Sequence, residues 1–498
     1  MRSVAIGSRP AQRLGRREAD GQRAPKIPSG LSESLRNRDF RLLWYGEGIS
    51  LLGDQFYLIS LPWLVLKLTG SAFAIGTVLA LVAVPRALFM LLGGALTDRF
   101  SPRTMMLCSN TSRLVVVGAL ALLTITGVTQ LWMLYVFALL FGLADAFFFP
   151  AQSAMIPRLL GTERLQTGNA IIQGTAQLSV FLGPVLAGTL IALLDGGGAA
   201  NPAVPDMWGI GVAFALDAAS FLVSAITLAM IRLPAAPQSE KKIVRKSGVL
   251  SSISDGLATV WQDKTLRHYF VLIAAVNLLM TGPISVGIPV LADTRFTGGA
   301  AAFGIILSAF GGGSLLGVII AGARRRPSAR RFPMLMLLFT GTMGIGLALL
   351  GVLSSMVPAA IVAFVMGLGQ GYVVIQFITW LQLRTARHML GRMMSVLMFA
   401  VVGLAPVSST IAGALIQWSA PFVMIGAGAM IVGVVVFAAF SPSVWRLADE
   451  SHTADAKTSA APQLAAATPL APVPSGMHVT GSAVLGRVGG VPASDLAA

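Results

Sequence analysis

Long apolar runs recur along this chain, and they constrain its fold more than any other feature. Between Leu42 and Phe440, stretches of about 20 residues carry few or no charges, which is the length an α-helix needs to cross a bilayer. Only 11% of the 498 residues are charged, against roughly 25% in soluble proteins. Because backbone groups in lipid must bond to one another, these runs predict an all-α membrane protein.

Charge alternates in the loops between these runs. Basic residues gather in the arm 1–39 and in every second loop, as the positive-inside rule expects of cytoplasmic segments. Residues 1–39 also lack the apolar stretch of a signal peptide, so the N-terminus is expected in the cytoplasm. An even number of spans returns the chain to the same side, so the C-terminus is expected there too. The net charge of +16 then reflects orientation in the membrane, not nucleic acid binding. The predicted spans are 40–67, 72–97, 104–126, 131–153, 166–194, 208–232, 266–293, 300–323, 332–354, 356–380, 393–417 and 419–443.

An internal repeat divides the spans into two halves. "LTGSAFAIG" (68–76) and "FTGGAAAFG" (296–304) share five residues at an offset of 228. Six spans return the chain to the same side, so the repeat predicts two pseudo-symmetric six-helix bundles with a binding site between them. The expected parts are a basic arm (1–39), a first bundle (40–232), a cytoplasmic loop with a short amphipathic helix (233–265), a second bundle (266–443) and a disordered tail (444–498).

Two motifs carry a resemblance to a known family. "GGALTDRFSPR", with Gly94, Asp98, Arg99 and Arg103, resembles the loop signature of the major facilitator superfamily. In that family the aspartate closes an inner gate against span eleven, which is expected here near 390. "SVFLGPVLAGTL" (179–190) resembles the family's antiporter motif and predicts a stripe of small residues that packs closely against a neighbouring helix. The motif residues are Ser179, Gly183, Pro184, Ala187 and Gly188.

Further passages, among them "FFFPAQSAMIP" (147–157) and "LGRMMS" (390–395), resemble bacterial exporters such as the enterobactin exporter and macrolide-efflux-like proteins. The resemblance spans about 36–443 and implies a monomeric exporter in the bacterial inner membrane, acting on amphipathic molecules of the drug or siderophore type. No loop for ATP phosphates is found, so a proton gradient is the expected energy source and no cofactor is expected. Candidate cavity-lining residues are Asn169, Gln173, Gln177, Asn277, Gln370 and Gln376.

Six charged residues lie inside predicted spans and away from the span ends, and all are in the first half of the chain: Glu47, Asp54, Arg86, Arg113, Asp145 and Asp217. Each costs roughly 2.5–3.5 kcal/mol at mid-bilayer, so they are expected to pair or to function. Depth along the helices suggests that Asp54 pairs with Arg86 and that Arg113 pairs with Asp145. Either Asp54 faces a cavity and carries a proton, or the pair is purely structural. The other candidate proton carriers are Asp145, Glu47 and Asp217.

Two other functions remain open. Movement of lysophospholipid between leaflets also occurs in this superfamily, and the scarcity of polar residues in the second half is compatible with it. A membrane sensor or scaffold that transports nothing would need a folded partner-binding segment outside the membrane, and neither terminus looks folded. No enzyme motif such as H-E-x-x-H or G-x-S-x-G is present, so the chain is not expected to be an enzyme.

Overall fold

The structure is a computed structural model that describes residues 29–97, 101–160, 164–195, 207–232, 257–324, 327–328, 331–385, 389–441 and 445. Twelve helical segments within this part are long and apolar enough to cross a membrane, which confirms the predicted number of spans. Most of the basic arm, the loop 233–256 and nearly all of the tail lie outside the described residues.

The first bundle begins with the short α1 (Ser29–Arg36), which leads into α2 (Arg38–Thr69). Asn37 caps α2, because its side-chain oxygen accepts hydrogen bonds from the backbone of Asp39 and Phe40. Gly70 ends α2 in the left-handed conformation, at φ 61°. The remaining helices are α3 (Ala72–Thr97), α4 (Pro102–Ile125), α5 (Leu131–Asp145), α6 (Phe148–Leu160), α7 (Leu165–Asp195) and α8 (Trp208–Met230).

The fourth span is broken into α5 and α6 at residues 146–147, a break that the sequence analysis did not predict. Pro150 explains it, because a proline ring clashes with the carbonyl four residues earlier and donates no hydrogen bond. The break follows directly after Asp145, which therefore lies at a helix end.

The second bundle contains two spans that are interrupted by π-helical turns. One comprises α10 (Lys264–Gly282), η2 (Pro283–Gly287) and α11 (Ile288–Thr294). The other comprises α15 (Leu390–Met398), η4 (Phe399–Gly403) and α16 (Ala405–Ile416). The uninterrupted helices are α12 (Ala300–Ala323), α13 (Arg331–Val352), α14 (Met356–Arg384) and α17 (Ala420–Ala439).

A helical stretch at 257–262 precedes α10, in the region where the sequence predicts a short amphipathic helix. Asp263 separates the two, because its carboxylate accepts hydrogen bonds from the backbone of Thr265 and Leu266 and so caps α10.

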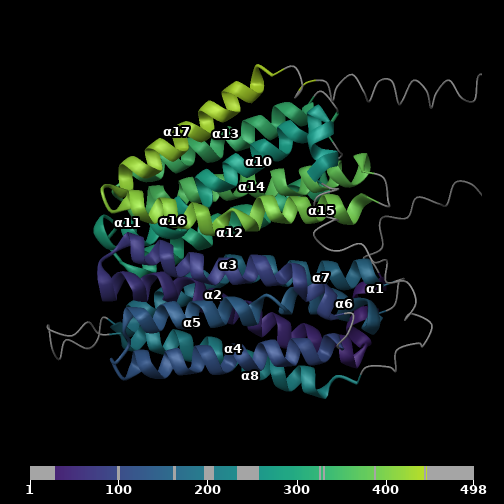
Figure 1. The fold of residues 1–498 in the computed structure, drawn as a ribbon, viewed down its shortest axis with the longest axis vertical. Helices are drawn as coiled ribbons and strands as arrows, with labels where there is room; N and C mark the ends of the chain where they lie inside the picture. The colour runs from purple at the N-terminus through teal and green to yellow at the C-terminus, as the bar shows by residue number, and fades with distance from the viewer. Residues whose placement is uncertain are drawn as a thin grey trace, which may run out of the picture. The chain divides into compact units, whose positions relative to one another are not determined.

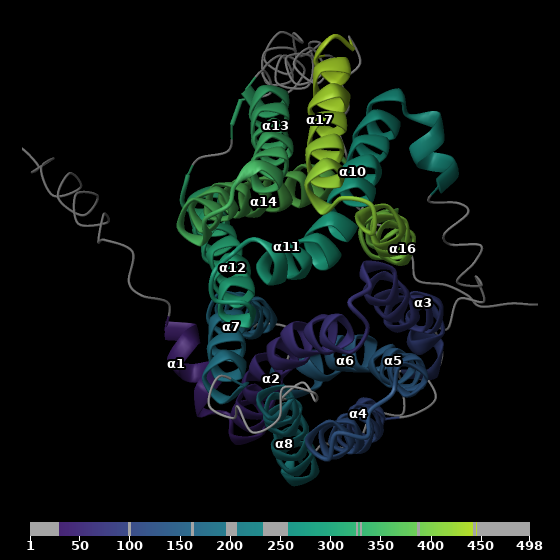
Figure 2. The ribbon, with the colours of Figure 1, turned by 90° about the vertical axis from the view of Figure 1, so that its left-hand side faces the viewer.

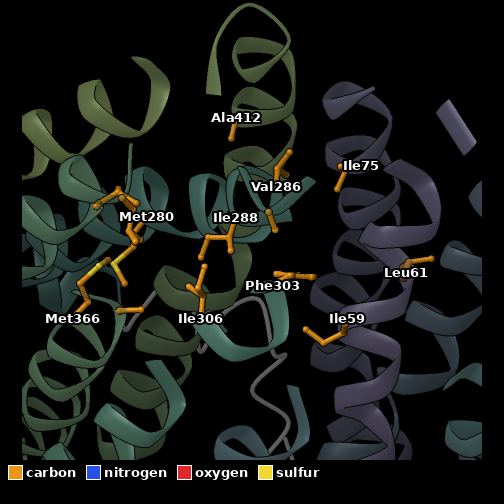
Figure 3. Close-up of a cluster of buried hydrophobic side chains, with 14 of the residues drawn as sticks. Ile59, Leu61, Ile75, Met280, Val286, Ile288, Phe303, Ile306, Met366 and Ala412 are labelled. Atoms are coloured by element: carbon orange, nitrogen blue, oxygen red, sulfur yellow. The ribbon is translucent and has the colours of Figure 1, made fainter. Parts of the chain in front are cut away.

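The two halves of the chain form two groups of helices that meet along a shared face (Figures 1 and 2). We call the helix ends where α2 finishes and α3 begins the distal side, and the opposite ends the proximal side. Buried apolar side chains continue from one bundle into the other, as Figure 3 shows for Ile59 of α2 and Phe303 of α12. The bundles therefore share one apolar core.

Glycine allows the bundles to touch at two crossings in the distal half. At the crossing of α7 and α12, a Cβ on Gly188 would lie 2.4 Å from the carbonyl oxygen of Ala300 and 3.0 Å from Cα of Gly304. At the crossing of α3 and α16, a Cβ on Gly76 would lie 2.3 Å from the carbonyl oxygen of Ser409. Small residues let helices in membranes approach closely, so these crossings hold the distal side closed.

Polar contacts reinforce the same side. Lys67 of α2 pairs with Asp293 of α11 at 2.6 Å, and the Gln417 amide donates to the Ser71 hydroxyl at 2.9 Å. Where both partners belong to the described part of the chain, every hydrogen bond or ion pair between the bundles lies in the distal half.

Candidate functional site

Arg113 of α4 is the centre of a charged cluster inside the first bundle. Its side chain is only 1% exposed, and one guanidinium nitrogen lies 3.2 Å from the Asp145 carboxylate and 3.7 Å from the Asp54 carboxylate. The rings of Phe148 and Phe221 lie against the guanidinium, with centroids at 4.3 and 4.4 Å. Ion and ring contacts thus replace the water that a buried cation loses.

Asp145 is held by two arginines. Besides Arg113, it contacts Arg86 of α3 at 3.0 Å, and its side chain is 13% exposed. The expected pair of Asp54 with Arg86 is therefore wrong. The cause is close packing of α3 on α5: Gly142 leaves room for the backbone of Val82, and Arg86 lies one helical turn beyond Val82, beside Asp145.

Asp54 is held more loosely than Asp145. Among the described residues it has a single ion-pair partner, at the longest distance in the cluster, and its side chain remains 33% exposed. Arg86 and Arg113 supply two positive charges, and Asp54 and Asp145 supply two negative ones. A change in the protonation of Asp54 would alter this balance without removing either contact of Asp145.

Glu47 and Asp217 lie near the cluster and are buried. One Glu47 oxygen accepts a hydrogen bond from the Gln152 amide, and Asp217 lies beside Gly53 of α2. The second oxygen of Glu47 (Oε2) and one oxygen of Asp217 (Oδ2) have no hydrogen-bond partner among the described residues. These two acids connect α2 to α6 and α8, respectively, and are less accessible than Asp54.

The antiporter-like motif of α7 forms the close contacts between helices that its small residues predict. Gly183 packs against Gln55 of α2, whereas Gly188 packs against α12 of the other bundle. Ser179, Pro184 and Ala187 are buried with them. The motif therefore packs α7 against α2 of its own bundle and against α12 of the other bundle.

Three of the candidate cavity-lining residues lie along α7: Asn169 and Gln173 are exposed and Gln177 is half-buried. In the gating loop, Gly94 lies within α3, while Asp98 and Arg99 lie outside the described residues. The guanidinium of Arg103 donates hydrogen bonds to the carbonyls of Leu228 and Ala229 at the end of α8, where a cation is favoured.

A cavity of about 390 Å³ lies inside the second bundle, and Asn277 and Gln370 line it together with mostly apolar side chains. Gln376 is placed differently from the expectation: it is buried, and its amide lies 3.5 Å from the Ala321 carbonyl of α12. Gln376 lies about one and two-thirds turns beyond Gln370, so its side chain is on another side of α14.

Sequence reasoning missed several residues that complete the charged cluster. Asn110 accepts a hydrogen bond from Arg113 and donates one to Ser224 at 2.8 Å. Asn110 lies three residues before Arg113 on the same helix, so the helical spacing was a usable signal. The contacts with Phe148 and Phe221 depend on how helices from different parts of the chain pack, and no local pattern indicates them.

Twelve membrane-spanning helices in two bundles, with ionisable groups buried inside one of them, define a polytopic membrane transporter. Residues 43–408 match the family model of the Major Facilitator Superfamily, and the chain belongs to that family. It is a transporter and not an enzyme, and the resemblance to bacterial exporters is confirmed.

Relatives and solved structures agree with this assignment. The multidrug efflux pump Tap of Mycolicibacterium fortuitum is 26% identical over 406 residues, covering 79% of this chain and 93% of Tap. Macrolide efflux protein A of Streptococcus pyogenes is 23% identical, covering 57% and 66% of the two chains. The solved nucleoside transporter NupG is similar in fold, with a TM-score of 0.63, 12% identity and coverage of 80% and 97%. A bacterial homologue of the iron transporter ferroportin, solved in an inward-facing state, is also similar in fold, with a TM-score of 0.62, 14% identity and coverage of 80% of this chain and 98% of that one.

Proposed function

We propose that this protein is a proton-coupled exporter of amphipathic small molecules, with Asp54 as the proton carrier. The observation that carries the proposal is the contrast between Asp54 and Asp145. Asp145 is fixed between two arginines, whereas Asp54 has one distant partner in the described part of the chain, and its side chain is partly exposed. An acid that must bind and release a proton needs this combination of access and a movable counter-charge.

Alternating access provides the movement. The glycine crossings and the pair of Lys67 with Asp293 close the distal side. With the termini in the cytoplasm, as the basic loops predict, this state faces inward. Export then requires the distal contacts to separate while the proximal side closes. Protonation of Asp54 would weaken its attraction to Arg113 and shift the balance between the two states.

The names of the relatives support the substrate class. Tap is called a multidrug efflux pump, and the streptococcal relative is called a macrolide efflux protein. The cavity of the second bundle, lined mostly by apolar side chains with a few amides and hydroxyls, fits a partly apolar substrate of this kind.

Proton flux in proteoliposomes tests the proposal, with erythromycin as the probe substrate. Wild-type protein should move protons when erythromycin is added, and Asp54→Asn should lose this flux at least about tenfold if it removes the only proton carrier. Asp39→Asn is the matched control, because Asp39 is a half-buried carboxyl at the far proximal end of the same helix. Equal flux in wild type and Asp54→Asn would reject Asp54 and make Asp145 the next candidate.

A further inference from the structure

A groove on the outside of the second bundle follows α10 and α17, which lie side by side (Figure 2). At the proximal ends of these helices it forms a hollow of about 290 Å³, which we call the proximal hollow. Exposed apolar residues of both helices belong to it, among them Val271 and Phe437. Its polar residues lie at the proximal end: Trp261, Arg267, His268 and Ser441. The proximal hollow therefore joins a polar end to an apolar wall.

A second hollow, of about 480 Å³, continues the groove towards the distal side. Val271 and Leu278 of α10 are seven residues apart, as are Met430 and Phe437 of α17, so each pair shares one face of its helix. Both hollows therefore open on the same side of the helix pair. From Arg267 to Leu278 the helix rises about 16 Å. This is close to half of the roughly 30 Å apolar thickness of a bilayer, so the groove has the length of one lipid leaflet.

Two basic side chains at the proximal end have no acidic partner among the described residues. Arg267 is half-buried and donates a hydrogen bond to the Trp261 carbonyl at 3.4 Å. Lys264 lies about one turn earlier on the same face of α10 and is exposed. The acid next to it, Asp263, is paired with Arg384 at 3.0 Å. Positive charge without a counter-charge thus lies beside the apolar wall.

Tryptophans mark this end of the bundle as a membrane–water interface. Trp261 and Trp445 are both exposed, and the Trp445 indole donates to the Ala439 carbonyl at 2.7 Å. Tryptophan is enriched at the depth of the lipid headgroups. Leu257 lies one turn before Trp261 in the helical stretch 257–262 and is exposed as well, as expected of an apolar face that rests on a membrane. Arg267 is therefore at headgroup depth, and the apolar wall is at the depth of the acyl chains.

We propose that the groove binds an anionic phospholipid from the leaflet on the proximal side. Arg267 donates to a phosphate oxygen of the headgroup, Lys264 adds positive charge, and the acyl chains lie along the apolar wall. A guanidinium group suits phosphate oxygens, and basic pockets between membrane helices bind anionic headgroups. A second copy of this chain fits less well, because a symmetric contact would bring the same uncompensated cations together. The inference does not depend on the proposed export function.

Quenching of Trp261 by brominated lipids tests the site in phosphatidylcholine vesicles. Either phosphatidylglycerol or phosphatidylcholine, brominated near the headgroup, is added, and the Trp261 signal is the difference between wild type and Trp261→Phe. Phosphatidylglycerol should half-quench this signal at a mole fraction at least about tenfold lower than phosphatidylcholine, because each of two basic residues favours an anionic lipid about fivefold. Equal quenching by the two lipids would overturn the inference.

Charge variants separate a defined site from general attraction to a basic protein. Arg267→Gln and Lys264→Gln should each lower the preference for phosphatidylglycerol about fivefold, each measured against its own Trp261→Phe version. Arg158→Gln is the matched control, because Arg158 is exposed near the proximal end of α6 in the other bundle. It should leave the preference unchanged. An unchanged preference in Arg267→Gln, or an equal loss in Arg158→Gln, would contradict the assignment.

Filling the proximal hollow tests the apolar wall. Ala438→Phe places a ring in the hollow and should abolish the preference, whereas Val436→Phe, at an exposed position of α17 outside the hollow, should not change it. A preference that survives Ala438→Phe would show that the lipid lies elsewhere. Quenching that falls as the number of protein copies per vesicle rises would assign the groove to a second copy of the chain and overturn the inference.

Discussion

The two bundles have opposite interiors. The first encloses Arg113 with several carboxylates, whereas the second contains no charged residue from Phe332 to Leu383 and encloses an uncharged cavity. Both bundles are built from six spans, so this difference comes from their side chains and not from their architecture. Under the proposed function, proton chemistry lies in one bundle and apolar recognition in the other.

This separation has a physical advantage. A buried cation is stabilised by nearby carboxylates, and a wide apolar cavity beside them would remove the packing that excludes water and fixes their geometry. Placing the cavity in the other bundle leaves the tight contacts of Arg113 with Phe148 and Phe221 undisturbed. The two chemistries then interact only through movement of the bundles.

The largest expected effect comes from removing the central cation. Arg113→Met should lower the free energy of unfolding by about 3–5 kcal/mol, because it removes the one ion-pair partner that Asp54 has among the described residues and one of the two arginines that hold Asp145. Unfolding of the purified protein in detergent, followed by circular dichroism, measures the change. Arg86→Met is the control: its side chain is 49% exposed, so its loss should be clearly smaller. Equal losses would show that the burial of Arg113 does not increase its contribution to stability.

The second-largest effect is expected at the crossing of α7 and α12. Gly188→Ala places a methyl group 2.4 Å from a backbone oxygen of Ala300, so the distal side should open and the labelled distance there should lengthen. Spin labels at Thr126→Cys and Ser355→Cys, in a Cys108→Ser background, report this distance by double electron–electron resonance. Gly174→Ala on the same helix is the matched control, because its Cβ meets nothing within 4 Å. An unchanged distance distribution in Gly188→Ala would mean that this crossing does not control closure.

The fold was largely predictable because lipid allows few alternatives: apolar runs and turn residues such as Gly70 determine where spans begin and end. Pairing inside the cluster was less predictable. Depth along the helices correctly predicted the ion pair of Arg113 with Asp145. It assigned Arg86 to the wrong carboxylate, because the approach of α3 to α5 depends on the contact of Gly142 with Val82. The Tyr269 hydroxyl has no hydrogen-bond partner among the described residues. This too depends on three-dimensional packing, and no spacing in the sequence indicates it.

The smallest expected effect concerns an ion pair at the edge of the second bundle, outside its uncharged interior. Burial raises the pKa of Asp263, but hydrogen bonds from Leu266, Arg384 and Thr265 and the charge of Arg384 outweigh it and lower that pKa below its ordinary value of 3.8. The folded state thus binds a proton less readily than the unfolded state. The contribution of Asp263 to stability is present above pH 3.8 and is lost as pH falls through the lower folded pKa.

Asp263→Asn keeps an oxygen that can cap α10 but removes the 3.0 Å ion pair with Arg384. Because both side chains are partly exposed, we expect a loss of less than about 1 kcal/mol at pH 7. The difference between wild type and Asp263→Asn should shrink as the pH falls below 3.8, measured by thermal unfolding in detergent. Because the variant keeps the capping oxygen, a difference that stays constant as pH falls would show that the charge of Asp263 does not stabilise this edge, and the comparison with the buried charges of the first bundle would lose its basis.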